Sequence, residues 1–215
     1  MASGWMMRWA LGAWMAVAGG CALASAPNSP SRFESFPTEV RRTAGLALDG
    51  DARGRPFAII DKKAARLYVF HADGRLAGAS PALLGLARGD VSPPGVGQKV
   101  LSGIPPGERI TPAGRFDSEP GRNLKGEAIV WFDYEAALAI HRLRPAPAAE
   151  RRPQRLASDE AEDKRISLGC VVVAGAFYDE VVAPLLGRQR GVVYVLPEMG
   201  EGGPLAGGPI AAPRL

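Results

Sequence analysis

The chain has 215 residues, of which 47% are hydrophobic and 22% charged, enough to bury one sizeable core but hardly two. Its formal net charge of +4 favours acidic partners only mildly, and no run of Lys and Arg interleaved with aromatic residues indicates a nucleic-acid-binding surface. We therefore expect a single domain that acts as a monomer and does not bind nucleic acid.

The N-terminal segment has the pattern of a secretory signal. Arg8 is followed by a short apolar run that ends in small residues at Ala22-Leu23-Ala24, which is too short for a membrane span. We expect a signal peptide over residues 1–24. An alternative is a lipid anchor on Cys21, although the Leu usual three positions before such a cysteine is missing. In either case we expect export to the periplasm or cell envelope.

The next elements follow in chain order. Residues 25–50 are expected to be a linker, because the part up to about Glu39 is rich in Pro, Ser and Asn and shows no hydrophobic period. Residues 51–198 should form the domain, and the Gly- and Pro-rich residues 199–215 a flexible tail.

Within the domain, apolar segments of strand length are separated by Gly and Pro. They lie at residues 56–61, 66–71, 128–132, 137–141 and 192–196, and the first four predict two strand pairs. Helical spacing occurs only at 174–186, where Phe177, Val181 and Leu185 share one face. The sequence predicts a mostly β fold with one principal helix.

The candidate nucleophile is Cys170. Cys21 lies in the expected signal peptide, so Cys170 would be the one cysteine of a mature exported chain and would have no intramolecular disulfide partner. A free thiol needs a base to become nucleophilic at neutral pH. His141, at the end of a predicted strand, is the candidate general base. The structural alternative is that Cys170 is a small buried hydrophobic residue.

The residues before Cys170 suggest how an oxyanion would be stabilised. Gly169 leaves room for a substrate carbonyl, and the N–H groups of Gly169 and Cys170 are candidate donors. Ser167 is expected mainly to stabilise the turn. Two His and one remaining Cys, widely separated, give no metal-site spacing, so we expect neither a metal nor another cofactor.

The motifs together resemble the L,D-transpeptidase catalytic domain of the YkuD type. The resemblance rests on Thr111-Pro112-Ala113-Gly114-Arg115-Phe116, His141, Ser167-Leu168-Gly169-Cys170 and the residues from Phe177 to Pro197, and it covers about Phe57 to Pro197. It implies a YkuD-like β-sandwich and a role in cell-wall biogenesis and cell shape. It also implies an acyl-enzyme on Cys170 with a peptidoglycan tetrapeptide stem, release of D-alanine, and transfer of the acyl group to an amine.

The resemblance also implies roles for residues near the thiol. The backbone carbonyl of Arg142 would orient His141, and Ser167, Leu168 and Gly169 would contact substrate or its oxyanion. The family usually has His where Leu168 stands and Asn or Arg where Val172 stands. The backbone N–H of Leu168 is kept, but the usual side-chain contacts with substrate are lost.

One insertion and two alternative activities accompany this hypothesis. Residues 145–163 lengthen the interval between His141 and Cys170, and they form either a solvated surface loop or a lid in which Arg151, Arg152 and Arg155 bind acidic stems. With water as acceptor the enzyme would be an L,D-carboxypeptidase. Without activity it would be a peptidoglycan-binding protein.

Overall fold

The structure is a computed structural model that describes Met1 and residues 35–199. The expected signal peptide beyond Met1, Cys21 and the tail beyond Met199 lie outside the described residues. None of the helices in this part of the chain is both long and apolar enough to cross a membrane.

The domain is built on an eight-stranded sheet with the order β3-β2-β1-β10-β5-β6-β7-β9. The pairs β1–β10 and β7–β9 are parallel, and the other neighbours are antiparallel. The strands are β1 (Phe57–Asp61), β2 (Arg66–Phe70), β3 (Leu76–Pro81), β5 (Gly114–Arg122), β6 (Ala128–Asp133), β7 (Leu138–Arg142), β9 (Val171–Val173) and β10 (Gly191–Val195). The expectation of a mostly β fold is confirmed. A separate parallel pair joins β4 (Leu84–Gly85) and β8 (Arg165–Ser167).

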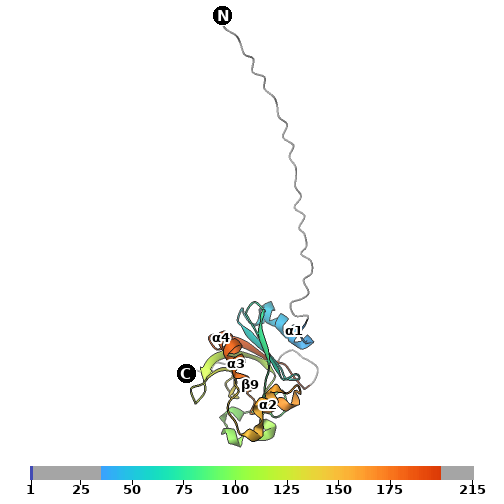
Figure 1. Cartoon of the computed structure of the whole chain (residues 1–215), viewed down its shortest axis with the longest axis vertical. Helices are drawn as coiled ribbons and strands as arrows, with labels where there is room; N and C mark the ends of the chain where they lie inside the picture. Colours follow the sequence, from blue (N-terminus) through green and yellow to red (C-terminus); the bar gives the residue numbers. More distant parts are fainter. Residues whose placement is uncertain (2–34, 200–215) are drawn as a thin grey trace. The chain divides into compact units, whose positions relative to one another are not determined.

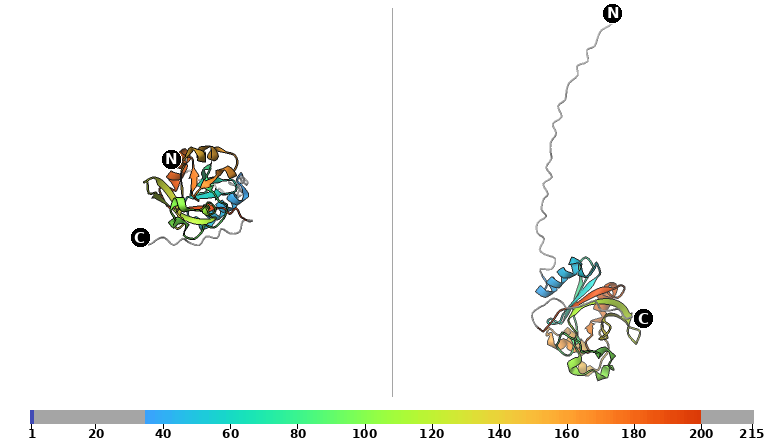
Figure 2. Two further views of the ribbon diagram at one scale, coloured as in Figure 1. Left: turned by 90° about the horizontal axis from the view of Figure 1, so that it is seen from below. Right: turned by 180° about the vertical axis from the view of Figure 1, so that it is seen from behind.

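Three helical regions pack around the sheet. Helix α1 (Thr38–Leu46) continues into a π turn over Ala47–Asp51, and α2 is Arg152–Ala157. The predicted helix after Cys170 is one helical segment made of α3 (Gly175–Phe177), a π turn over Tyr178–Val182, and α4 (Ala183–Leu185). In Figure 1 and the right-hand view of Figure 2, α1 and α2 lie toward opposite ends of the domain.

The neighbouring strands β1 and β10 are buried on both faces, which explains their largely apolar sequences. In β1, Phe57 and Ile59 belong to the apolar cluster that contains Val40 and Ala44 of α1. The alternate residues of β1 belong to a second cluster, which contains Tyr178 and Val182 of the C-terminal helical segment. Side chains alternate between the faces of a strand, so one strand serves both cores.

Helix α1 lies within the range expected to be a linker. Val40, Ala44 and Ala47 are buried against the sheet, and their spacing of four and three residues is that of one helix face. Two of the three are alanines, so the apolar signal of this helix is weak in the sequence. The packed part of the chain thus begins before residue 51.

The insertion at 145–163 is folded and packed against the domain. It contains α2 and short 3-10 turns at Ala148–Glu150 and Glu162–Lys164. Leu156 of α2 is buried in a small cluster with Leu83 and Val172. Of the two alternatives left open for this segment, the merely solvated loop does not fit its buried contacts. In the chain it lies between β7 and β8, and β7 still pairs directly with β9, the strand that follows Cys170.

Candidate active site

Strand pairing brings His141 and Cys170 to one cleft. His141 is paired with Val172 in the parallel β7–β9 ladder, and Cys170 immediately precedes β9. Both residues line a cleft of about 320 Å³, together with residues from segments 96–104, 136–138, 144–152 and 167–172. Two residues that are 29 positions apart in the sequence therefore open onto the same space.

The imidazole of His141 is held by the backbone next to it. Its Nδ1 atom lies 2.7 Å from the carbonyl oxygen of Arg142. Because a carbonyl only accepts hydrogen bonds, Nδ1 carries the proton and Nε2 has the free electron pair. His141 is 9% exposed, and burial lowers the pKa of its imidazole to about 4. The imidazole is therefore neutral at neutral pH.

The thiol of Cys170 is half-buried, and Sγ lies 3.9 Å from the carbonyl oxygen of Ala137. Burial raises the pKa of the Cys170 thiol, and this effect is opposed by a hydrogen bond from the Ala139 backbone and by the positive charge of Arg144. At neutral pH the resting site therefore contains a thiol and a neutral imidazole rather than an ion pair.

The turn before Cys170 requires its glycine. Gly169 has φ of 128°, and a Cβ added there would lie 2.6 Å from the carbonyl oxygen of Ile110. Both the backbone conformation and the lack of space exclude a side chain. Gly169 therefore allows the turn before Cys170 to lie directly against the segment that ends at Thr111.

Ser167 stabilises this turn from inside. Its Oγ donates a hydrogen bond to the Cys170 carbonyl at 2.6 Å and accepts one from the Gly169 N–H at 3.1 Å. The Gly169 N–H, expected to be an oxyanion donor, is thus used within the turn. The N–H groups of Leu168 and Cys170 make no hydrogen bond to another described residue, so these two are the available donors.

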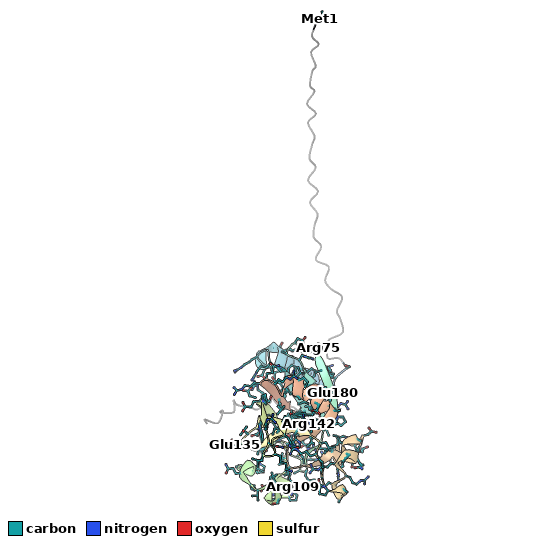
Figure 3. The ribbon with its side chains drawn as sticks, turned by 60° about the vertical axis from the view of Figure 1, so that its left-hand side comes forward. Met1, Arg75, Arg109, Glu135, Arg142 and Glu180 are labelled. Carbon is teal, nitrogen blue, oxygen red and sulfur yellow. The ribbon has the colours of Figure 1, made fainter. Side chains whose placement is uncertain are left out.

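The side chain of Arg142, whose carbonyl oxygen contacts His141, is itself held by three neighbouring residues. Its guanidinium hydrogen-bonds to Asp179 and, at 3.1 Å, to the carbonyl oxygen of Ala128. It also lies 4.2 Å from the ring centroid of Tyr178, in a cation–π contact. Figure 3 shows Arg142 near the middle of the domain, between Arg75 and Arg109 at its two ends. No pattern in the sequence predicts these contacts.

Three cations line the cleft, each paired with a carboxylate. Lys99 pairs with Glu108, Arg152 with Glu150, and Arg144 with Glu127 at 2.9 Å. Of the three arginines expected to bind substrate from the insertion, Arg152 alone is among the lining residues of this cleft.

The other two arginines of the insertion have different surroundings. Arg155 donates hydrogen bonds to the carbonyls of Glu150 and Asp163, so its guanidinium holds the insertion together. Arg151 lines a neighbouring pocket, which shares Arg144, Arg152 and the residues from Pro145 to Pro147 with the cleft. Arg144, which the sequence did not single out, contributes positive charge at both Cys170 and His141.

Leu168 and Val172 both line the cleft. Val172 is 1% exposed and packs with Leu83 and Leu156, so an apolar residue suits its position in this chain. Within residues 35–199, no three His, Cys, Asp or Glu side chains gather in a way that could hold a metal ion.

Comparisons with known proteins give distant structural likenesses. No protein-family model matches the sequence, and no curated protein matches it. The helical cell shape determining protein Pgp2 from Campylobacter jejuni is similar at 15% identity and a TM-score of 0.46, over 74% of this chain and 57% of that chain. Its K307A mutant is similar at 16% identity and a TM-score of 0.44, over 78% and 59% of the two chains.

A third structure is the fused Zn-dependent amidase/peptidase/peptidoglycan-binding domain-containing protein from Clostridium acetobutylicum, at 16% identity and a TM-score of 0.38, over 74% of this chain and 63% of that chain. The present chain spans less than two thirds of the length of each of these proteins.

Proposed function

We propose that this protein is an exported peptidoglycan L,D-transpeptidase that uses Cys170 as its nucleophile. The observation that carries the proposal is the arrangement of His141. The contact from Nδ1 to the Arg142 carbonyl leaves Nε2 with a free electron pair, and His141 and Cys170 line the same cleft. The sequence resemblance described above supplies the substrate class.

In the first half-reaction, Sγ of Cys170 attacks the carbonyl carbon of the third residue of a tetrapeptide stem, which is bonded to the nitrogen of the terminal D-alanine. Nε2 of His141 takes the thiol proton as the S–C bond forms, because both groups are neutral at rest. The oxygen of the tetrahedral intermediate accepts hydrogen bonds from the N–H groups of Cys170 and Leu168. His141 then gives its proton to the departing D-alanine nitrogen, and a thioester is left.

In the second half-reaction, an amine attacks the thioester carbonyl. His141 takes a proton from that amine and returns it to the sulfur when the C–S bond breaks, so the thiol and the neutral imidazole are restored. The acceptor is an amine of a neighbouring stem or of a protein lysine. Water in the same place would make the reaction a carboxypeptidase reaction.

The charges of the cleft support an anionic substrate. Arg144 is half-exposed and pairs with a carboxylate that is itself 44% exposed. Exposed ion pairs contribute little to stability. Arg144 can therefore leave Glu127 and pair with a substrate carboxylate at a small cost in free energy. We infer that Arg144 binds a carboxylate of the stem peptide beside the reacting thiol.

The function is tested by incubating the exported protein with purified disaccharide-tetrapeptide and identifying the products by mass spectrometry. A crosslinked dimer supports the transpeptidase, and a disaccharide-tripeptide supports the carboxypeptidase. Unchanged substrate, with binding detected by calorimetry, would replace both with a binding protein. Cys170→Ala is the control, since it removes only the sulfur atom and should not turn over substrate.

A further inference from the structure

The buried ammonium group of Lys62 contacts several segments of the chain that surround the turn before Cys170. The Lys62 side chain, just after β1, is 0% exposed. Its Nζ donates to the Gly89 carbonyl at 2.6 Å, to Asp90 Oδ1 at 2.6 Å and to the Thr111 carbonyl at 2.9 Å. A buried charge is tolerated only when it is paired and hydrogen-bonded in this way.

The partners of Lys62 lie at both ends of one wall of the cleft. Gly89 and Asp90 precede the segment 91–110, and Thr111 follows it. Val96, Leu101 and Ile104 of this segment line the cleft. The Lys62 ammonium group therefore binds both ends of the segment 91–110 and keeps them close together.

The same network reaches the strand that leads to the turn before Cys170. Glu198 accepts the Gly89 N–H at 2.9 Å and pairs with the guanidinium of Arg165, which also donates to the Lys62 carbonyl at 3.1 Å. Arg165 begins β8, the strand that ends at Ser167.

Thr111 connects this network to the peptide that carries the Cys170 N–H. The Thr111 side chain is completely buried. Its Oγ1 accepts the Gly85 N–H at 2.9 Å and donates to the Gly169 carbonyl at 2.8 Å. That carbonyl and the Cys170 N–H belong to one peptide unit. In a trans peptide the C=O and N–H bonds point in opposite directions, and none of the peptide bonds described is cis. Thr111 therefore fixes the direction of the Cys170 N–H.

We propose that Thr111, anchored by Lys62, is a positioning residue that aims the Cys170 N–H at the oxyanion. The inference extends the proposed function to a residue that touches neither the substrate nor the sulfur. Thr111 acts through the Gly169–Cys170 peptide. It affects reactions that form an oxyanion in the cleft and leaves the nucleophilicity of the thiol unchanged.

Two reagents separate these effects. Acylation of Cys170 by p-nitrophenyl acetate passes through a tetrahedral oxyanion, whereas alkylation by iodoacetamide does not. Thr111→Val removes the hydroxyl at nearly constant volume. We expect it to slow acylation about tenfold or more, since loss of one oxyanion donor has effects of this order or larger. Alkylation should stay within about twofold of wild type over pH 6 to 9, because the environment of the thiol is kept.

Two variants complete the test, with labelling at Cys170 followed by mass spectrometry of the peptide. Thr111→Ser keeps the hydroxyl and should restore acylation. Thr43→Val removes the hydroxyl of a buried threonine in α1 and should change neither reaction. The proposal is overturned if Thr111→Val acylates at the wild-type rate, if both reactions slow equally, or if Thr111→Ser fails to rescue. Wild type that is acylated by the ester but inert toward disaccharide-tetrapeptide would overturn the proposed function and leave this inference intact.

Discussion

The Nδ1 atom of His141 lies 2.7 Å from the carbonyl oxygen of Arg142, the next residue in β7. A backbone group therefore does the orienting that a carboxylate does in many catalytic triads. Among the described residues, no carboxylate hydrogen-bonds to this imidazole. Without a negative partner in contact, burial dominates and lowers the pKa of His141 to about 4. The imidazole of His141, the proposed base, is thus neutral throughout the physiological pH range.

The neutral pair predicts how alkylation of Cys170 depends on pH. We expect His141→Ala to slow iodoacetamide labelling near pH 7, where the thiol needs a base, and to lose this effect at high pH, where the thiol ionises without help. The measurement is the labelling rate of the Cys170 peptide from pH 6 to 10. His71→Ala, at the β2–β3 turn, is the matched control and should follow wild type. Equal rates for His141→Ala and wild type at all pH values would contradict the assignment of the base.

The same pKa shift predicts a loss of stability in acid. A histidine titrates near 6.5 in the unfolded chain and His141 near 4 in the folded one, so the unfolded state binds more protons between these values. Stability from this group is therefore complete above about pH 6.5 and falls as the pH drops toward 4, by about 3 kcal/mol at most. His141→Gln should reduce this acid sensitivity, which can be measured by urea unfolding at several pH values. An unchanged pH profile would mean that the imidazole titrates normally.

A third prediction concerns Gly169. Replacement by Ala should destabilise the fold by about 2 to 4 kcal/mol, from the positive φ and the clash together. Gly126→Ala is the control, because Gly126 has φ of 78° but no atom within 4 Å of an added Cβ. It should cost only about 1 kcal/mol. If thermal unfolding shows that the two variants lose equal stability, the segment containing the Ile110 carbonyl shifts to make room for the added Cβ, and the predicted clash adds nothing.

A fourth prediction concerns the cleft cations. Arg144→Gln should raise KM for disaccharide-tetrapeptide roughly tenfold, since a hydrogen bond to a charged group contributes on the order of 1.5 kcal/mol or more. Arg151→Gln, outside this cleft, should leave KM unchanged. Steady-state kinetics of both variants make the comparison. If KM rises in Arg151→Gln and not in Arg144→Gln, the substrate carboxylate binds in the neighbouring pocket and the assignment of Arg144 is wrong.

The strands that could be predicted are those with strong local signals. Phe57–Asp61 and Gly191–Val195 are apolar, β-branched or aromatic, because both of their faces are buried. Strand β5 contains Gly114, Pro120 and Gly121, which are poor strand formers, and it is held by its neighbours rather than by propensity. Helix α1 was missed for a similar reason, since alanines provide much of its buried face.

The site was only partly visible in the sequence. The turn containing Cys170 and the histidine that shares its cleft are local motifs. Thr111, by contrast, bonds to a carbonyl 58 residues away, and in the sequence it is only the first residue of the motif Thr111–Phe116. The Gly169 N–H donates a hydrogen bond to Ser167 Oγ. This bond depends on the conformation of the serine side chain, which the spacing of residues in the sequence does not indicate.

A fifth prediction lies in the N-terminal segment. If the signal is cleaved after Ala24, the exported chain begins at Ser25. If Cys21 is lipidated, the chain begins with an acylated cysteine and partitions into detergent. Intact-mass analysis of the exported protein decides between these products. A full-length product kept in the cytoplasm would contradict export.

The central claim is a thioester on Cys170, and the most direct measurement is the mass of the protein quenched in acid during turnover of disaccharide-tetrapeptide. We predict an adduct equal to the substrate less one D-alanine, located on the Cys170 peptide, removed by hydroxylamine and absent from Cys170→Ala. Turnover that persists in Cys170→Ala, or an adduct on another residue, would contradict the account.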